Sequence, residues 1–262
     1  MATSRRTFLK GGATAVVAGG AWLNRRSAAA MALSGEEPQS PAALVAVIDA
    51  AKVSPPISKY MYGMFLEHLG SLTYRSLWSE VLDDRKFYFP VTSAKPEETP
   101  RPAFRRPLRK WNPIGGDEFV AMDTGHAYVG EHSPRIKLEG ATARGIQQSG
   151  LSLRKGIMYT GRVALSGASG TMVEVTLAWG SGAGDRHSLT ISGLHSGYAT
   201  FPLKFTSQAD TDEGQLQITG TGRDFFHVGI ISLMPEDNVH GFRRDTTKLL
   251  HDLDSGFYRL PG

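Results

Sequence analysis

The sequence predicts a mainly β protein whose largest part is a β-sandwich of jelly-roll type. Between about residue 125 and residue 233, short apolar stretches alternate with glycine-marked turns, which suits eight or nine strands in two packed sheets. The stretch Thr171–Trp179 alternates cleanly, with Val173, Val175, Leu177 and Trp179 on one face. We therefore expect Trp179 to be buried. Around this region, separate strand and helix patterns indicate a second kind of structure.

The predicted strands of the sandwich share β-branched and aromatic residues bounded by turn formers. They cover residues 125–130, 133–138, 145–151, 157–165, 171–179, 188–191, 198–205, 215–218 and 225–233. A further β-rich stretch, Ala42–Asp49, is predicted to be a strand that packs beside the other elements.

An aromatic-rich apolar run, Lys59–Gly70, is predicted to be a short buried strand. It carries charge only at its far end, in Glu67 and His68. Buried parallel strands of barrels have this form, because their polar residues emerge at the carboxyl end, where loops build the site. A core strand with a solvated Glu-His tip is an equally good interpretation of the composition.

Two segments have helical spacing. Leu77, Trp78, Val81 and Leu82 follow i, i+1, i+4, i+5, which predicts a short helix with Trp78 in the core. Residues 244–253 predict a second helix with Asp245 as its N-cap and a stripe formed by Leu249, Leu250 and Leu253. Another strand is expected from Phe257 onward.

Several motifs carry a resemblance to a known family. They are Tyr62–His68, Leu77–Leu82, Asp84–Phe87, Ile231–Pro235 with Asn238 and Gly241–Arg243, and Arg259–Gly262. In this order the chain resembles the opening of α-L-arabinofuranosidases of glycoside hydrolase family 51. The resemblance implies a jelly-roll-like sandwich, similar to a carbohydrate-binding module, inserted between the first two strands of an incomplete (β/α)8 barrel.

The same resemblance, with the composition, suggests a division of the chain. We expect a signal peptide in 1–32, a linker in 33–41, a sandwich strand followed by the first barrel strand and helix in 42–89, a linker in 90–107, the sandwich in 108–235, and a barrel helix with the second strand in 236–262.

The family resembled releases terminal α-L-arabinofuranosyl groups from plant polysaccharides with retention. Such hydrolysis needs two carboxyl groups about 5–5.5 Å apart. In that family both are glutamates at the ends of the fourth and seventh strands, which would lie beyond residue 262, so no catalytic residue is assigned here. The resemblance gives Glu67 and Arg259 substrate-binding positions. We expect the chain alone to be inactive and a downstream chain to supply the remaining barrel.

Two other interpretations remain open. The chain is alternatively a free-standing glycan-binding sandwich without catalysis, or an exported structural or partner-binding sandwich. Glycan binding needs exposed aromatic rings, and Trp111 and Tyr128 lie in loop-like sequence that suits such a platform. An arabinose-containing polysaccharide or oligosaccharide is the expected partner. A purely structural module that shapes the rim of a cleft is an equally good interpretation.

The first residues predict export. Ser4–Lys10 is a twin-arginine signature, followed by an apolar run too short and glycine-rich to span a membrane. Residues 1–32 carry five basic residues and no acidic ones, so their removal changes the net charge from +4 to −1. The basic character of the sequence is therefore no argument for nucleic acid or membrane partners. A periplasmic or extracellular location is expected.

Metal and cofactor signals are weak. The chain has no cysteine, which excludes disulfides and thiolate metal sites, and its histidines show no paired zinc spacing. No cofactor is expected. Asp210 and Asp212 form an acidic turn that is a weak candidate for structural calcium, although it lacks the full calcium-loop pattern. A solvated turn is the simpler interpretation.

Overall fold

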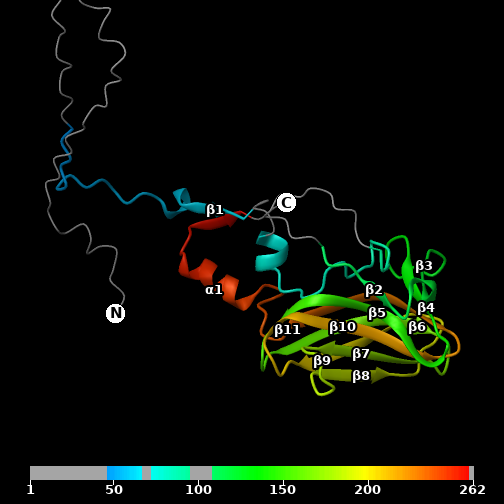
Figure 1. Cartoon of the computed structure of the whole chain (residues 1–262). Helices are drawn as coiled ribbons and strands as arrows, with labels where there is room; N and C mark the ends of the chain where they lie inside the picture. The colour runs from blue at the N-terminus through cyan, green and yellow to red at the C-terminus, as the bar shows by residue number, and fades with distance from the viewer. Residues whose placement is uncertain (1–45, 67–71, 95–107, 260–262) are drawn as a thin grey trace, which may run out of the picture. The chain divides into compact units, whose positions relative to one another are not determined.

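The structure is a computed structural model that describes residues 46–66, 72–94 and 108–259 (Figure 1). The chain divides into two compact units, 1–55 and 56–262. The described part of the first unit, 46–55, has no helix or strand, and Val47 and Ile48 are exposed. The strand predicted over Ala42–Asp49 is therefore wrong for residues 46–49, because no described strand pairs with them; residues 42–45 lie outside the described residues.

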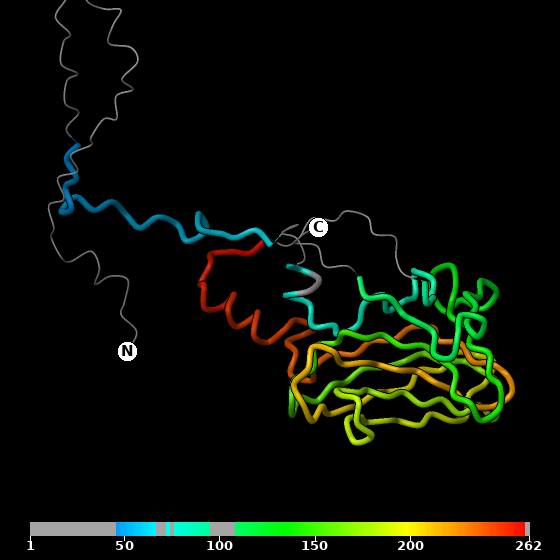
Figure 2. The backbone as a smooth tube through the Cα atoms, viewed as in Figure 1, coloured from blue at the N-terminus to red at the C-terminus, as the bar shows by residue number. Residues whose placement is uncertain are grey.

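Ten antiparallel strands form two five-stranded sheets, and Figure 2 follows the chain between them. One sheet has the order β2 (Asn112–Ile114), β5 (Gly140–Leu153), β10 (Thr211–Gly222), β7 (Met172–Ala178), β8 (Arg186–Ile191). The other has the order β3 (Val120–Asp123), β4 (Ser133–Lys137), β11 (Phe225–Pro235), β6 (Met158–Gly167), β9 (Ala199–Thr206). The protein is thus mainly β, with a sandwich as its largest part, as predicted.

The core of the sandwich follows the alternation of the strands. In β7, Val173, Val175 and Leu177 are fully buried, whereas Met172 is 54% exposed. Trp179 is 7% exposed, so its predicted burial is confirmed. The alternation thus predicts the inward residues, whereas Thr176 and Ala178 of the opposite face are also buried, at 3% and 6% exposure.

Within the sandwich, one predicted strand is wrong and two strands were not predicted. Residues 125–130 form a loop, because Asp123 Oδ1 accepts a hydrogen bond from the Gly125 backbone N–H (2.8 Å) and Gly130 has φ of +74°. This turn ends β3 at Asp123. The short strands β2 and β3 pair with β5 and β4, and both lie in sequence that is typical of a loop.

The helix predicted over Leu77–Leu82 is also wrong. A π-helical segment, Leu72–Leu77, ends where that helix was expected. Residues 79–91, which we call the strap, contain no helix, and their part from Val81 to Arg85 runs beside β11. The Val81 N–H donates to Leu233 O (2.9 Å), and the Ile231 N–H donates to Arg85 O (3.1 Å). These bonds use the edge of β11 that β4 leaves free, since β4 pairs only with its first three residues. Within the strap, Leu82 is buried in the sandwich core.

A parallel pair joins distant parts of the chain. β1 (Gly63–Phe65) pairs with β12 (Phe257–Arg259), with Met64 opposite Tyr258. Only three of the residues predicted as a strand in Lys59–Gly70 form one, and their side chains are exposed, so a buried strand is wrong for the described part. Parallel strands need a crossover connection, and here it contains the whole sandwich and a helix (Figure 1). The barrel itself remains a prediction.

Helix α1 (Arg244–Asp252) leads into β12, as expected from the sequence. Asp245 is not its N-cap: Arg243 occupies that position, and Asp245 lies in the first turn, where its Oδ2 accepts from Arg243 Nη2 (2.6 Å). Leu249 and Leu253 of the predicted stripe are exposed. No helix in the described part of the chain is long and apolar enough to cross a membrane.

The two ends of the sandwich insertion lie side by side. Trp78 and Phe242 form an antiparallel bridge, and their rings meet edge to face at 6.0 Å. The Ser79 N–H donates to Gly241 O (2.9 Å), and the Arg243 N–H donates to Leu77 O (2.8 Å). An insertion whose ends meet in this way leaves the flanking elements undisturbed.

Candidate functional site

The residues predicted to bind substrate belong to the strand pair. Arg259 ends β12, and its guanidinium carbon lies 4.2 Å from the centre of the Phe65 ring, a cation–π contact. The Leu66 N–H donates to Arg259 O (2.8 Å), which holds the end of β1 beside Arg259. Glu67 lies outside the described residues. The substrate-binding roles of Arg259 and Glu67 therefore stay predictions.

Trp111 is not a sugar platform. Its side chain is 2% exposed, and its Nε1–H donates to the backbone oxygens of Asp83 (3.2 Å) and Asp84 (3.3 Å). Its ring lies 5.3 Å from that of Phe87 in the core. A buried ring cannot stack on a sugar, so the prediction for Trp111 is wrong. The sequence around Trp111 is typical of a loop, and nothing in it indicates that the strap covers the indole.

Tyr128 is 41% exposed and belongs to what we call the aromatic cluster, His126, Tyr128, Tyr198 and His227. The rings of Tyr128 and Tyr198 lie 5.0 Å apart, and His126 stacks on Tyr198 at 5.0 Å with an interplanar angle of 15°. The Tyr198 hydroxyl donates to His126 O (2.8 Å). A Cβ on Gly229 would lie 2.5 Å from Tyr128 Cβ, so only glycine lets the tyrosine sit there. Tyr128 is thus an exposed ring whose position is fixed by its contacts with Tyr198 and Gly229.

A carboxylate lies beside the aromatic cluster. His227 Nε2 and Asp123 Oδ2 are 2.8 Å apart, and the His227 side chain is 4% exposed. Burial lowers the pKa of His227, and the hydrogen bond from His227 lowers the pKa of Asp123. At neutral pH the pair is therefore a neutral imidazole that donates to an ionised carboxylate. The Asp123 side chain is 25% exposed, so it can also accept hydrogen bonds from hydroxyl groups.

Sequence reasoning missed the polar members of this site. The histidine spacing predicts only ordinary surface or core residues, and nothing in the sequence marks Asp123. The contact depends on β3 and β11 lying on either side of β4 in one sheet, which joins residues 104 positions apart. No local sequence signal marks this pairing.

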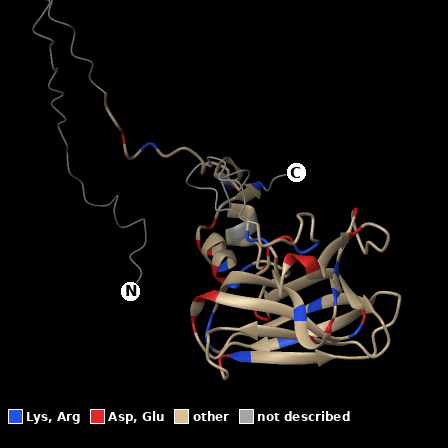
Figure 3. Cartoon of the chain, turned by 45° about the vertical axis from the view of Figure 1, so that its right-hand side comes forward, with Lys and Arg blue, Asp and Glu red and all other residues tan. Residues whose placement is uncertain are grey.

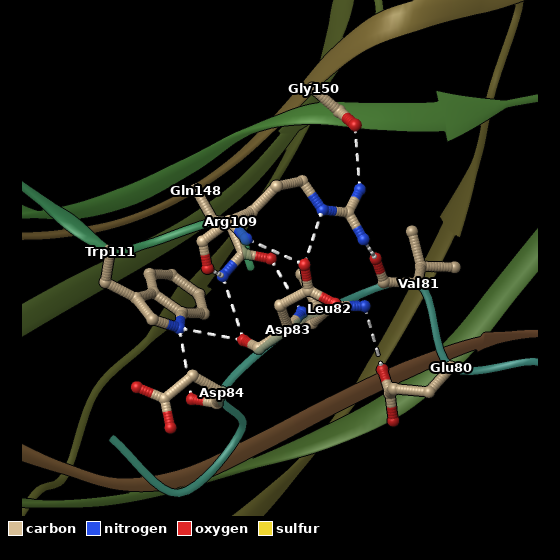
Figure 4. A network of polar contacts seen from close by, with 9 residues as sticks. All are labelled: Glu80, Val81, Leu82, Asp83, Asp84, Arg109, Trp111, Gln148 and Gly150. Atoms are coloured by element: carbon tan, nitrogen blue, oxygen red, sulfur yellow. Dashed lines mark hydrogen bonds and ion pairs between the residues drawn. The ribbon is translucent and has the colours of Figure 1, made fainter. Parts of the chain in front are cut away.

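A second polar group, the docking network, ties the strap to the sandwich (Figure 4). The Arg109 guanidinium donates to Asp83 Oδ2 (3.1 Å), Gly150 O (2.7 Å) and Val81 O (2.7 Å). The Gln148 side chain, 0% exposed, accepts from the Asp83 N–H (2.8 Å) and donates to Asp83 O (2.9 Å). This arrangement fixes the strap, and Asp83 and Arg109 also line a cleft beside it.

Glu80 is the buried carboxylate of the strap, with a side chain 4% exposed. It accepts from Ser232 Oγ (2.6 Å), the Leu233 N–H (2.8 Å) and Arg85 Nη1 (3.4 Å). Burial raises the pKa of Glu80, although these hydrogen bonds oppose the shift. Since its lone pairs are engaged by β11 and Arg85, Glu80 serves to attach the strap.

A cleft of about 1270 Å³ lies between the strap, the sandwich and α1. Its lining mixes aromatic and charged groups, and Figure 3 shows both signs of charge on α1. The lining includes Trp78, Tyr159, Arg154, Asp212, Glu213, Asp237, Arg243, Arg244, Asp245 and Lys248. A cleft of this kind suits a polar, hydroxylated ligand better than an apolar one.

The acidic turn does not fit calcium well. Asp210 Oδ1 accepts from the Lys155 N–H (3.0 Å), and Asp212 Oδ1 accepts from Ser152 Oγ (2.6 Å). Calcium takes six to eight oxygen ligands, whereas no group of three or more His, Cys, Asp or Glu residues in the described ranges could hold a metal ion. The geometry gives the calcium prediction no support.

The predicted site residues do not converge. Arg259 lies on β12, Tyr128 in the loop after β3, Trp111 in the core, and Asp212 on β10. The structure instead offers the exposed ring of Tyr128, supported by the more buried rings of the aromatic cluster, with the partly exposed carboxylate of Asp123 beside the cluster. That combination is the usual chemistry of a sugar-binding surface, a ring for the C–H face and oxygens for the hydroxyls.

Comparison with known proteins finds glycoside hydrolases that are similar to this chain. No protein-family model matches the sequence. An extracellular exo-α-L-arabinofuranosidase of Streptomyces chartreusis is 24% identical over 82% of this chain and 25% of its own length. α-L-Arabinofuranosidase 2 of Arabidopsis thaliana is 24% identical over 86% of this chain and 34% of its own length.

The similarity extends to the fold. The structure of arabinose-bound MgGH51 α-L-arabinofuranosidase matches 78% of this chain and 34% of its own, with a TM-score of 0.58 and 18% identity. The resemblance to α-L-arabinofuranosidases of glycoside hydrolase family 51 is thereby confirmed. The chain spans about a quarter to a third of the length of these relatives.

Proposed function

We propose that this chain is the amino-terminal portion of an exported α-L-arabinofuranosidase that acts on arabinose-containing plant polysaccharides with retention. The observation that carries the proposal is the similarity to an arabinofuranosidase along 82% of the chain. The parallel pairing of β1 with β12 across the inserted sandwich supports it, because a repeated strand–helix–strand unit builds a (β/α)8 barrel. The twin-arginine signature Ser4–Lys10 supports export to the periplasm or beyond.

Within this function the aromatic cluster holds polysaccharide at the start of β11, whereas the cleft is lined by Pro235 at the other end of that strand. The exposed Tyr128 ring supplies an apolar face for a sugar, and Asp123 supplies an acceptor for its hydroxyl groups. Both are fixed by their neighbours, so binding costs little side-chain entropy.

Bond cleavage is assigned to residues that a further polypeptide segment supplies. A retaining mechanism needs a nucleophile and an acid/base about 5–5.5 Å apart. Glu80 and Asp83 are engaged in attaching the strap, which leaves them unsuited to these roles. We therefore expect the 262-residue chain to bind arabinose-containing glycan without hydrolysing it.

The test compares two proteins on an aryl α-L-arabinofuranoside: the 262-residue chain, and the same chain extended by any reading frame that continues it in the genome. The extended protein should release the aryl group and the shorter one should not. Glu67→Gln in the extended protein should lower kcat/KM at least tenfold if Glu67 positions the sugar. Release of the aryl group by the 262-residue chain alone would refute the proposal that a further polypeptide segment supplies the catalytic residues.

A free-standing glycan-binding sandwich is the second candidate. The aromatic cluster and Asp123 belong to β3, β11 and the loops that precede β4 and β9, so this surface needs no residue outside the sandwich. Calorimetry against arabinan and arabinoxylan tests it. Heat of binding without any activity in an extended protein would favour this candidate, whereas no heat with either polymer would reject it.

A further inference from the structure

The loop of residues 124–132, which joins β3 to β4, covers a histidine on the outer face of the β3-β4-β11-β6-β9 sheet. Phe226 and Val228 of β11 belong to the core, so His227 between them points to the opposite face. Its side chain is nevertheless only 4% exposed, because the rings of His126 (4.9 Å) and Tyr198 (6.4 Å) lie against it. The burial of His227 therefore depends on the loop staying closed.

His126 is the side chain through which this loop contacts the sheet. Its ring stacks on Tyr198 and lies beside His227, and its Nε2 is 3.2 Å from Ser166 Oγ on β6. The Tyr198 hydroxyl donates to the backbone oxygen of His126 (2.8 Å). Because Tyr128 follows two residues later, the position of its exposed ring depends on the same contacts.

The two ring nitrogens of His227 have different surroundings. Nε2–H donates to Asp123 Oδ2 (2.8 Å), whereas the buried Nδ1 has no hydrogen-bond partner among the described residues. In the neutral ring Nδ1 is only a lone pair, and leaving it unpaired is a modest cost. A protonated ring would place a second N–H there, and a buried donor without an acceptor is strongly unfavourable.

The charged groups around His227 come from three elements. Arg135 of β4 lies opposite His227 in the strand register and His126 belongs to the loop, and a positive charge on either disfavours a proton on His227. Asp123 of β3 favours the proton, but it already accepts from the neutral ring, so protonation adds attraction without a new hydrogen bond. The remaining neighbours on β6 and before β9 are neutral, namely Ser166 and Tyr198.

The closed loop therefore disfavours protonation of His227. Burial lowers the pKa of His227 from its ordinary value of 6.5, and the hydrogen bond to Asp123 opposes this shift only in part. When the loop opens, water reaches the ring and its ordinary affinity for the proton returns. The stability of the closed loop is thus fully present above pH 6.5 and decreases as the pH falls through 6.5 toward the lowered pKa.

We propose that His126 and His227 form an acid-sensitive latch, which holds the 124–132 loop closed at neutral pH and releases it in acid. Release hydrates His227 and lets the two imidazoles separate. Since Tyr128 belongs to the same loop, its ring then loses its fixed position. Weaker glycan binding in acid is the functional consequence, and this consequence rests on the proposed function.

Hydrogen exchange of the Tyr128 N–H, which donates to Ser133 Oγ (3.0 Å), tests the latch by NMR on the 262-residue chain. Its rate, divided by the intrinsic rate at each pH, should rise at least about tenfold between about pH 7.5 and about pH 5. Amides of β10 should keep their protection, because only the loop opens. His227→Gln retains a donor for Asp123 but does not gain a proton, so its corrected exchange rate should stay nearly constant.

His251→Gln is the matched control, the same substitution at a side chain on α1 that is 89% exposed, and it should keep the response of the parent chain. If the melting temperature of His227→Gln shows that it is unfolded at neutral pH, His126→Gln replaces it and should show a smaller response than the parent.

Three results would overturn the proposal: a constant exchange rate in the parent chain, an equal loss of protection in β10, or a parent-like response in the folded latch variant. Exchange is measured without glycan, so a failure of the latch and a failure of the proposed function are seen separately.

Discussion

Arg109 connects three parts of the chain through one guanidinium. Its Nε–H and Nη groups donate to the strap at Asp83 Oδ2 and Val81 O, and to β5 at Gly150 O. A planar group with several fixed donors can satisfy acceptors in three directions, which a lysine ammonium on a flexible stem cannot do.

Arg109→Lys should therefore destabilise the protein although the charge is kept. Loss of two net hydrogen bonds predicts a fall of about 2 kcal/mol in the free energy of unfolding, measured by urea denaturation. Arg162→Lys, at an exposed position on β6, is the matched control and should change little. Equal stabilities of the two variants would show that the guanidinium contacts contribute nothing.

Glu80 makes the stability of the protein depend on pH. Burial raises its pKa above the ordinary value of 4.5, so the folded state holds the proton more tightly than the unfolded state does. The contribution of Glu80 to the free energy of unfolding is thus fully present below pH 4.5. It is lost as the pH rises through the raised pKa of the folded state.

Glu80→Gln removes this titration. The unfolding free energy of the parent protein, minus that of the variant, should decrease as the pH rises from about 4 to 7, because only the parent must bury a charge. Urea denaturation at several pH values measures this difference. Glu236→Gln, the same substitution at an exposed position outside the strap and the core, is measured alongside as the control. A rising difference for Glu80→Gln would contradict the assignment.

At the scale of elements, the close contact of β6 with β11 limits which residues fit. A Cβ on Gly161 would lie 1.9 Å from Ser232 O, a backbone atom of the neighbouring strand. Because the backbone of a central strand cannot move away without breaking its ladder, the space is available to glycine alone.

Gly161→Ala should lower the free energy of unfolding by about 2 kcal/mol or more, through the shift that it forces between β6 and β11. The comparison is Gly184→Ala, where a Cβ meets nothing within 4 Å and the stability should hardly change. Thermal melting followed by circular dichroism distinguishes them. Similar melting temperatures would mean that the strands separate without cost.

For the whole molecule, stability should be uneven. Helix α1 has no buried residue, and β1 and β12 share only three residue pairs, whereas the core of the sandwich contains many fully buried side chains. Segments with few buried apolar contacts open at low free energy, independently of global unfolding.

Hydrogen exchange should show this difference directly. Amides of β6, β10 and β11 should exchange at least about a hundredfold more slowly than those of α1 and β12, and only the former should approach the rate set by global unfolding. Mass spectrometry of peptic fragments gives the rates. Equal protection of α1 and β11 would contradict the expectation.

Local sequence patterns determined the strands of the sandwich and helix α1. The alternation in β7, the glycine-marked turns and the helical stripe after Arg243 are properties of neighbouring residues, and the corresponding elements form. The family motifs likewise predicted the similarity to arabinofuranosidases. Where a local pattern met a competing non-local partner, the prediction was wrong, as for the helix over Leu77–Leu82, which is replaced by a strap on the free edge of β11.

Tertiary structure alone decided which residues share a surface. The burial of Trp111 depends on the strap, and the Asp123–His227 pair depends on β3 and β11 lying in one sheet. The sequence by itself determines the chemistry of each residue and the periodicity of the segment in which it lies. Contacts between segments arise only when sheet order and register bring distant positions together, and no local pattern encodes them.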